Sequence, residues 1–275
     1  MGGKVYHEGD WISLNGSTGD VYDGQVPTVD AELSGDFAAI MNLADKFTKV
    51  DVRTNADSPR DALVARKFGA KGIGLCRTEH MFFDAEKIVA MREMILSPDV
   101  EGRRKALAKL LPYQKADFKG IFKAMDGCPV NVRLLDPPLH EFVPHDLKGQ
   151  EEMAETMGVS VKEIQKRVES LCEHNPMLGH RGCRLGNTYP EITEMQTRAI
   201  LGAALDLKKE GIEAKPEIMV PLTGILYEFK EQEKVIRTAA EELFKEVGDR
   251  IEFKVGTMIE IPRAALTADR IASSA

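Results

Sequence analysis

Short apolar runs alternate with amphipathic helical stretches along the chain from about residue 36. We predict strands near residues 50–54, 72–77, 130–135, 177–179, 217–221 and 254–260. The stretches between them predict helices at 36–48, 58–69, 84–96, 99–110, 114–126, 148–156, 160–173, 190–210 and 226–248. Strands that alternate with long helices form parallel βαβ units. The predicted fold class of residues 36–275 is therefore α/β, a TIM-type (β/α)8 barrel that is incomplete, with about six of its eight βα units.

Residues 1 to about 35 differ in character from the rest of the chain. Two short apolar stretches flank a turn that contains Asn15 and Gly16, which is a signal for a β-hairpin. An isolated hairpin is at best marginally stable in water, so we expect this segment to be the tail of a larger β-rich domain. Residues 25–35, with Pro27 and Gly35 among acidic and small residues, are expected to be a linker.

Composition excludes several classes of function. The chain of 275 residues carries a formal net charge of −7, which argues against nucleic acid as the main partner. Neither a membrane-spanning run nor a signal peptide is found in the sequence. The widely spaced Cys76, Cys128, Cys172 and Cys183 contain no CxxC pair, so zinc is not expected. Free thiols in a reducing compartment are expected instead, which favours the cytoplasm, or a plastid or another organelle in a eukaryote.

Arginines stand at the ends of several predicted strands. Arg53, Arg77 and Arg133 each close an apolar run and are followed by polar residues, and a further basic cluster covers residues 180–184. Guanidinium groups that converge on one mouth suit phosphate or carboxylate, which they bind through two parallel hydrogen bonds. For any single arginine, a salt bridge at the rim of the barrel is the alternative.

A carboxylate closes the last predicted strand. In residues 256–262 (GTMIEIP) an apolar run ends in Glu260, followed by Ile261 and Pro262. In an α/β barrel the carboxyl ends of the strands carry the chemistry, because the βα loops open there. A buried lone acid is costly, so Glu260 is expected to be paired, protonated or bound to a metal.

Several long motifs resemble one enzyme family. Residues 72–83 (GIGLCRTEHMFF), 175–184 and 256–262 are similar to signatures of the phosphoenolpyruvate-utilising enzymes. Within that family, residues 133–142 (RLLDPPLHEF) resemble the pyruvate, phosphate dikinases. The resemblance implies that residues 1–35 end a swivelling phosphohistidine domain with its linker, and that residues 36–275 are part of a barrel that binds phosphoenolpyruvate and pyruvate.

The resemblance also implies roles for individual residues. Arg77 and Arg133 match positions that hold the phosphoryl group and carboxylate of phosphoenolpyruvate and act in catalysis, and Glu260 matches a Mg²⁺ ligand that also lies at the substrate. Arg53 and Arg181 are weaker candidates for the same anion shell, with Asn55 and Asp136 as its hydrogen-bonded support. The activity implied is the interconversion of ATP, pyruvate and phosphate with AMP, phosphoenolpyruvate and diphosphate through a phosphohistidine, in a homodimer.

Other parts of the family's machinery are expected outside this chain. The phosphohistidine is expected before Met1, and a second metal ligand and an acid cysteine after Ala275, so residues 1–275 alone are expected to be inactive. Alternatives are a relative of phosphoenolpyruvate synthase or of phosphotransferase-system enzyme I, a non-catalytic binding or dimerisation module, and a Mg²⁺-dependent aldolase barrel. Residues 136–140 argue against the first two, and the long motifs against the aldolase.

Overall fold

The computed structural model describes residues 3–29 and 32–275. The chain divides into two compact units, Met1–Thr48 and Lys49–Ala275. Among the helices in these described ranges, none combines the length and the apolar character that crossing a bilayer requires.

The first unit contains the predicted hairpin. Strands β1 (Ile12–Leu14) and β2 (Val21–Asp23) pair antiparallel, with Ser13 opposite Tyr22. The turn between them is closed by backbone hydrogen bonds from Asn15 to Asp20 and from Gly19 to Asn15. Helix α1 (Gly35–Phe47) follows and contains no buried residue. The hairpin and the helix are both confirmed.

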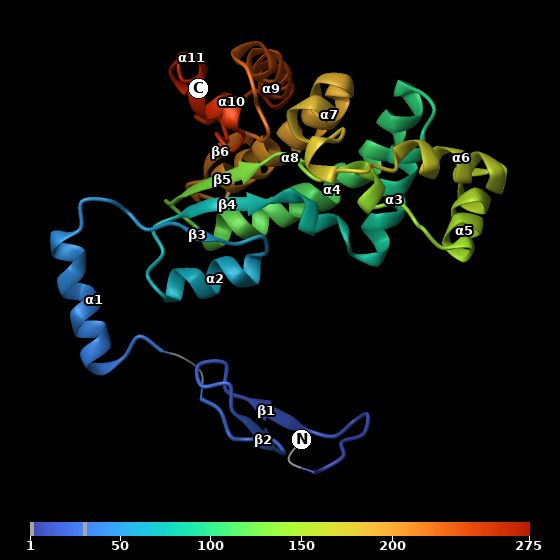
Figure 1. Cartoon of the computed structure of the whole chain (residues 1–275). Coiled ribbons are helices and arrows are strands. Elements are labelled where there is room, and N and C mark those ends of the chain that lie inside the picture. Colours follow the sequence, from blue (N-terminus) through green and yellow to red (C-terminus); the bar gives the residue numbers. More distant parts are fainter. Residues whose placement is uncertain (1–2, 30–31) are drawn as a thin grey trace. The chain divides into compact units, whose positions relative to one another are not determined.

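The second unit is built on a parallel sheet of five strands. These are β3 (Thr54–Asn55), β4 (Ile73–Arg77), β5 (Pro129–Arg133), β6 (Lys215–Val220) and β7 (Lys254–Thr257), in sequential order. The crossovers run through α2 (Pro59–Lys67), α3 (Ala85–Leu96), α4 (Val100–Ala124), α8 (Pro190–Lys209) and α9 (Leu226–Val247) (Figure 1). The α/β class with parallel βαβ units is confirmed. Within the described residues the sheet is open, because β3 and β7 form its two edges.

Three of the predicted strands were wrong in extent or type, and the strand predicted at 254–260 ends at Thr257. Residues 176–178 form a short 3₁₀ helix, η3 (Pro176–Leu178), because the Asn175 side chain accepts a hydrogen bond from the backbone N–H of Met177 and Pro176 fixes the first turn. The described chain therefore has five parallel strands and not six. The strand predicted at 50–54 starts only at Thr54, and Val50 and Val52 before it are exposed.

The two faces of the sheet differ in polarity. Val130, Val132, Ile218 and Val220 point to one face and are fully buried. There they pack with residues of α2, α4, α8 and α9 such as Ala62, Phe118, Ile200 and Phe229. The alternating positions carry Asn131, Arg133, Glu217, Met219 and Lys254 on the other face, as the two-residue period of a strand requires. Helices cover the apolar face, and the polar face carries charged side chains.

Helix α4 corrects the prediction of two helices at 99–110 and 114–126. It is continuous for 25 residues although Pro112 lies inside it. An interior proline costs a helix about 3 kcal/mol. Burial of Leu110, Phe118, Ile121 and Phe122 against neighbouring elements outweighs that cost.

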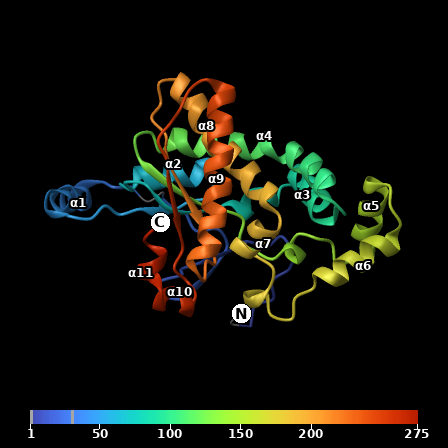
Figure 2. The same ribbon diagram turned by 90° about the horizontal axis from the view of Figure 1, so that it is seen from above.

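A second apolar cluster lies beyond α3. Helices α5 (Leu147–Met157) and α6 (Val161–Leu171) pack on one another there, away from the sheet in both views (Figures 1 and 2). The remaining short elements are η1 (Thr78–Phe82), η2 (Leu139–Glu141), α7 (Gly182–Thr188), α10 (Pro262–Leu266) and α11 (Ala268–Ile271). Helices α7, α10 and α11 were not predicted from the sequence.

Candidate functional site at the carboxyl end of the sheet

Arg77 and Arg133 are the last residues of two adjacent strands. Arg77 closes β4, Arg133 closes β5, and the two are register partners in the parallel ladder. Parallel strands end at the same edge of a sheet, so the sequence pattern that placed both arginines at strand ends also places them side by side.

Arg133 is held by two carboxylates. Its Nη2 donates to Oε1 of Glu79 at 2.5 Å, and its Nη1 lies 3.0 Å from Oδ2 of Asp136. All three residues are buried, with exposed fractions of 8%, 7% and 2%. Burying an ion costs several kcal/mol unless a partner compensates, which explains why Arg133 has two. Arg133 Nε and Glu79 Oε2 are buried without a hydrogen-bond partner among the described residues.

Arg181 joins the same cluster from another segment. Its Nη2 lies 2.9 Å from Oδ2 of Asp136, and its Nε lies 3.3 Å from Oδ1 of the same carboxylate. The backbone N–H of Gly182, whose φ is 56°, donates to the carbonyl oxygen of Asp136. Asp136 thus bridges Arg133 and Arg181 and ties the start of α7 to the end of β5. We call Glu79, Arg133, Asp136 and Arg181 the arginine cluster.

Arg77 is less constrained than Arg133 and Arg181. Its half-buried side chain has no hydrogen bond or ion pair with any described residue, although its backbone N–H donates to Oδ1 of Asp57 at 2.6 Å. Asn55, the last residue of β3, lies at the same edge of the sheet. An unpaired guanidinium beside a charge-balanced cluster is suited to bind an anion.

Glu260 lies in the loop after β7 and is exposed. The prediction of a buried strand through residue 260 was therefore wrong, because the strand stops at Thr257. Glu260 Oε1 accepts a hydrogen bond from the backbone N–H of Leu222 at 2.7 Å. Leu222 follows β6 with a φ of 58°, and it is the non-glycine residue with a left-handed backbone in the described ranges. Such a conformation costs roughly 1–2 kcal/mol.

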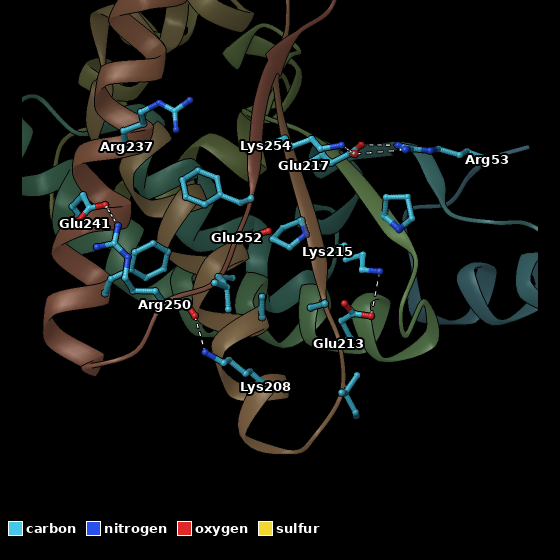
Figure 3. A pocket seen from close by; sticks show the side chains of 18 residues that line it. Arg53, Lys208, Glu213, Lys215, Glu217, Arg237, Glu241, Arg250, Glu252 and Lys254 are labelled. Carbon is cyan, nitrogen blue, oxygen red and sulfur yellow. Dashed lines mark hydrogen bonds and ion pairs between the residues drawn. The ribbon is translucent and has the colours of Figure 1, made fainter. Parts of the chain in front are cut away.

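Arg53 lies away from this site. It precedes β3 at the amino end of the sheet, and its Nη1 donates to Oε2 of Glu217 at 2.6 Å. The pair lines a cavity of about 910 Å³ at the amino ends of β5, β6 and β7. Figure 3 shows Glu217 between Arg53 and Lys254 there. The structure thus brings together Arg77, Arg133 and Arg181, and places Arg53 with a different set of charges.

The two buried cysteines are protonated groups. Burial raises the pKa of the Cys183 thiol to about 12, and the negative charge of Glu228 adds to the effect. Burial also raises the pKa of Cys76. Cys183 Sγ donates to the carbonyl oxygen of Leu222 at 3.2 Å. Both thiols therefore stay protonated at neutral pH.

Three residues of this region had no assigned role in the sequence interpretation. Glu79 holds Arg133, Asp57 binds the segment of Arg77, and Leu222 binds Glu260. The signal for Asp57 and Glu79 was their place just after predicted strand ends, where polar residues gather. No sequence signal marks Leu222, because leucine does not favour a left-handed backbone.

The carboxylates in the described part of the chain do not gather into a metal site by themselves. No group of three or more His, Cys, Asp or Glu side chains is arranged there to hold a metal ion. Glu260 Oε2 forms no hydrogen bond with a described residue, and a free carboxylate oxygen is the donor that Mg²⁺ or Ca²⁺ prefers. Glu260 fits such a cation as one ligand of a larger set.

Comparisons with known proteins agree on one family. The sequence profile described as PEP-utilising enzyme, PEP-binding domain, matches residues 31–275. Pyruvate, phosphate dikinase of Clostridium symbiosum is 55% identical over 276 residues, covering 100% of this chain and 32% of the relative. The enzyme of the same name from Giardia intestinalis is 55% identical over 275 residues (100% and 31%). The chloroplastic pyruvate, phosphate dikinase 1 of Arabidopsis thaliana is 54% identical over 277 residues (100% and 29%). The chain spans about a third of the length of these relatives.

Proposed function

The chain belongs to the PEP-utilising enzymes, with the PEP-binding domain of that family over residues 31–275, and we propose that it binds phosphoenolpyruvate and pyruvate at the carboxyl end of its sheet. In this proposal the binding serves the phosphoryl transfer of a pyruvate, phosphate dikinase. Residues 1–35 are proposed to end a phosphohistidine domain and its linker, and residues 36–275 to form part of the substrate barrel.

The observation that carries this proposal is the pairing of Arg77 with Arg133 at adjacent strand ends. Glu79 and Asp136 balance the charges of Arg133 and Arg181 and hold both guanidinium groups in place. Arg77 adds an uncompensated positive charge beside the arginine cluster. A ligand with one phosphate and one carboxylate needs several directed N–H donors, and guanidinium groups provide them.

The residues are assigned distinct tasks. Arg77 binds and neutralises the phosphoryl oxygens, while Arg133 and Arg181 present N–H groups fixed in direction by Asp136. Preorganised donors aimed at developing charge are a large term in catalysis, because they need no reorganisation during the reaction. Arg53 is proposed to be structural, since its guanidinium is paired with Glu217 at the amino end.

Glu260 is proposed to be one ligand of Mg²⁺. Its Oε1 is fixed by Leu222 N–H, which leaves Oε2 for the cation. When bound, the ion supplies Lewis acidity toward oxygen atoms of the substrate. The phosphohistidine domain as partner and a homodimer stay predictions.

Titration calorimetry of the 275-residue chain with phosphoenolpyruvate and Mg²⁺ tests the proposal. Arg77→Ala is expected to weaken binding at least about tenfold, since a charge-assisted hydrogen bond contributes about 1.5–3 kcal/mol. Arg53→Ala is the matched control, because it removes an arginine at the other end of the same sheet, and it should change the Kd less than about twofold. Equal effects of the two substitutions would contradict the assignment.

A further inference from the structure

We propose that Asp57 is a positioning residue for the anion-binding guanidinium of Arg77 and that it acts together with His80. The inference rests on the proposed function of Arg77 and extends it to Asp57 and His80, to which the sequence analysis assigned no role at the substrate. The supporting observation is that the Asp57 carboxylate contacts both the backbone N–H of Arg77 and the ring of His80.

Asp57 uses both of its oxygen atoms on the segment that carries Arg77. Oδ1 accepts the backbone N–H of Arg77 at 2.6 Å, and Oδ2 lies 2.7 Å from Nδ1 of His80. Arg77 is the N-cap of η1, and His80 lies within that 3₁₀ helix. The carboxylate therefore binds the segment at its start and three residues later, so it resists both a shift and a rotation of the turn.

Asp57 itself is held on both sides. Before it, the backbone N–H of Ala56 donates to the carbonyl oxygen of Leu75 and continues the β3–β4 ladder. After it, Ser58 caps α2 by accepting the backbone N–H of Asp61, and Pro59 occupies the first turn. A Cβ on Gly120 of α4 would lie 2.6 Å from Pro59, so this glycine permits the close approach of α2 to α4. The carboxylate is thus presented from a rigid backbone.

Arg77 needs a backbone anchor because its guanidinium group, unlike those of Arg133 and Arg181, has no ion-pair partner among the described residues. Arg133 and Arg181 are oriented by ion pairs to their own guanidinium groups. The Arg77 side chain has no such partner among the described residues, so the placement of its backbone decides where the guanidinium can reach. Thr78 and Glu79 lie between the two anchor points, and Glu79 in turn holds Arg133. A catalytic geometry tolerates errors of only about 0.5 Å, which such a double anchor can secure.

The hydrogen bonds between Asp57, Arg77 and His80 make Asp57→Asn an informative substitution. A carboxylate only accepts hydrogen bonds, so in the neutral ring His80 carries its proton on Nδ1 toward Asp57. In Asp57→Asn, the amide oxygen can still accept the Arg77 N–H while the amide nitrogen donates to Nδ1 of His80. Both contacts survive, and the ring proton moves to Nε2. The His80 side chain is 53% exposed, so this change of tautomer leaves the core untouched.

The experiment compares Asp57→Ala, Asp57→Asn and His80→Phe in the 275-residue chain. The Kd for phosphoenolpyruvate is measured by calorimetry, the fold by circular dichroism, and the tautomer of His80 from the ¹⁵N shifts of its ring. We expect Asp57→Ala to weaken binding at least about tenfold and His80→Phe about threefold, as loss of two hydrogen bonds or one predicts. Asp57→Asn should stay within about threefold of the original Kd while the ring proton moves to Nε2.

Unchanged binding in Asp57→Ala or in His80→Phe would overturn the inference, as would an Asp57→Asn variant that binds as weakly as Asp57→Ala. His80→Phe keeps the test decisive if Asp57→Ala fails to fold, because the histidine is exposed. Arg77→Ala distinguishes a failure of the proposed function from a failure of the positioning role of Asp57. If Arg77→Ala binds normally, the proposed function fails, whereas weak binding in Arg77→Ala with normal binding in the Asp57 and His80 variants refutes only the positioning role.

Discussion

Asp136 and Arg181, which are 45 residues apart in the chain, are joined through both carboxylate oxygens. The same Oδ2 atom of Asp136 also lies 3.0 Å from Nη1 of Arg133. One carboxylate that is 2% exposed therefore sets the direction of two guanidinium groups from different segments. The arginine cluster depends on it for both charge balance and geometry.

Replacing Asp136 by alanine is expected to lower the free energy of unfolding by about 3–5 kcal/mol, because it leaves two largely buried guanidinium groups with Glu79 as their one remaining carboxylate among the described residues. Urea unfolding followed by circular dichroism measures the change. Glu152→Ala is the control, since it removes the acid of the exposed Lys148–Glu152 pair, and it should cost less than about 1 kcal/mol. Similar losses in the two variants would show that Asp136 does not hold the cluster together.

The left-handed backbone of Leu222 is expected to reverse the usual order of stability of alanine and glycine variants. Both Leu222→Ala and Leu222→Gly lose a buried side chain, but only glycine relieves the left-handed backbone at φ 58°. The glycine variant is therefore expected to be at least as stable as the alanine variant, whereas glycine is usually worse by about 0.5–1 kcal/mol. Leu134, which is buried and outside the left-handed region, should show the usual order. Thermal unfolding of the four variants checks this, and the usual order at Leu222 would contradict it.

Glu260→Gln should reduce the effect of Mg²⁺ on phosphoenolpyruvate binding and leave stability almost unchanged. Glutamine keeps an oxygen for the Leu222 N–H but removes the charge that a hard cation requires. Calorimetric titrations with and without Mg²⁺ measure the effect, and denaturation should show a change below about 1 kcal/mol. Glu252→Gln, an exposed acid at the amino-end cavity, is the control. An unaltered Mg²⁺ effect in Glu260→Gln would remove Glu260 from the metal site.

The buried Cys183 thiol is expected to lower the free energy of unfolding at alkaline pH. Burial raises its pKa from 9.0 to about 12 in the folded chain, so between these values the unfolded thiol releases a proton that the folded thiol keeps. Stability contributed by the buried thiol is full below pH 9 and falls by up to about 1.4 kcal/mol per pH unit above it. Unfolding free energies at pH 8 and pH 10 should therefore differ less in Cys183→Ala than in the unaltered chain. The exposed Cys172→Ala should keep the original difference, and identical pH dependence in all three proteins would refute the prediction.

The sequence predicted what depends on local periodicity. Parallel strands and most helices follow from the alternation of apolar and polar positions, and the arginines at strand ends follow from it as well. Residues 177–179 were misread because an apolar triplet resembles a buried strand, whereas Asn175 and Pro176 favour a turn. Helix α4 was divided at Pro112 because its long-range packing is not visible in a local pattern.

The side-chain partners at the site could not be predicted from spacing. Asp57 and Arg77 are 20 residues apart and Glu79 and Arg133 are 54 apart, so only the strand register brings each pair together. Arg53 followed the same sequence pattern as Arg77 but lies just before the start of its strand, because β3 begins four residues later than predicted. A shift of a few residues at a strand boundary thus moves a side chain to the opposite end of the sheet.

The central claim is that the carboxyl end of the sheet binds phosphoenolpyruvate through Arg77 and the arginine cluster. Its most direct test is an NMR titration of the ¹⁵N-labelled 275-residue chain with phosphoenolpyruvate and Mg²⁺, following backbone amides and arginine Nε–H signals. We predict saturable shifts at residues 77–80, 133–136, 181–183 and 258–260, and their loss in Arg77→Ala. Saturable shifts confined to the amino-end cavity around Arg53 and Glu217, or shifts that persist unchanged in Arg77→Ala, would contradict the account.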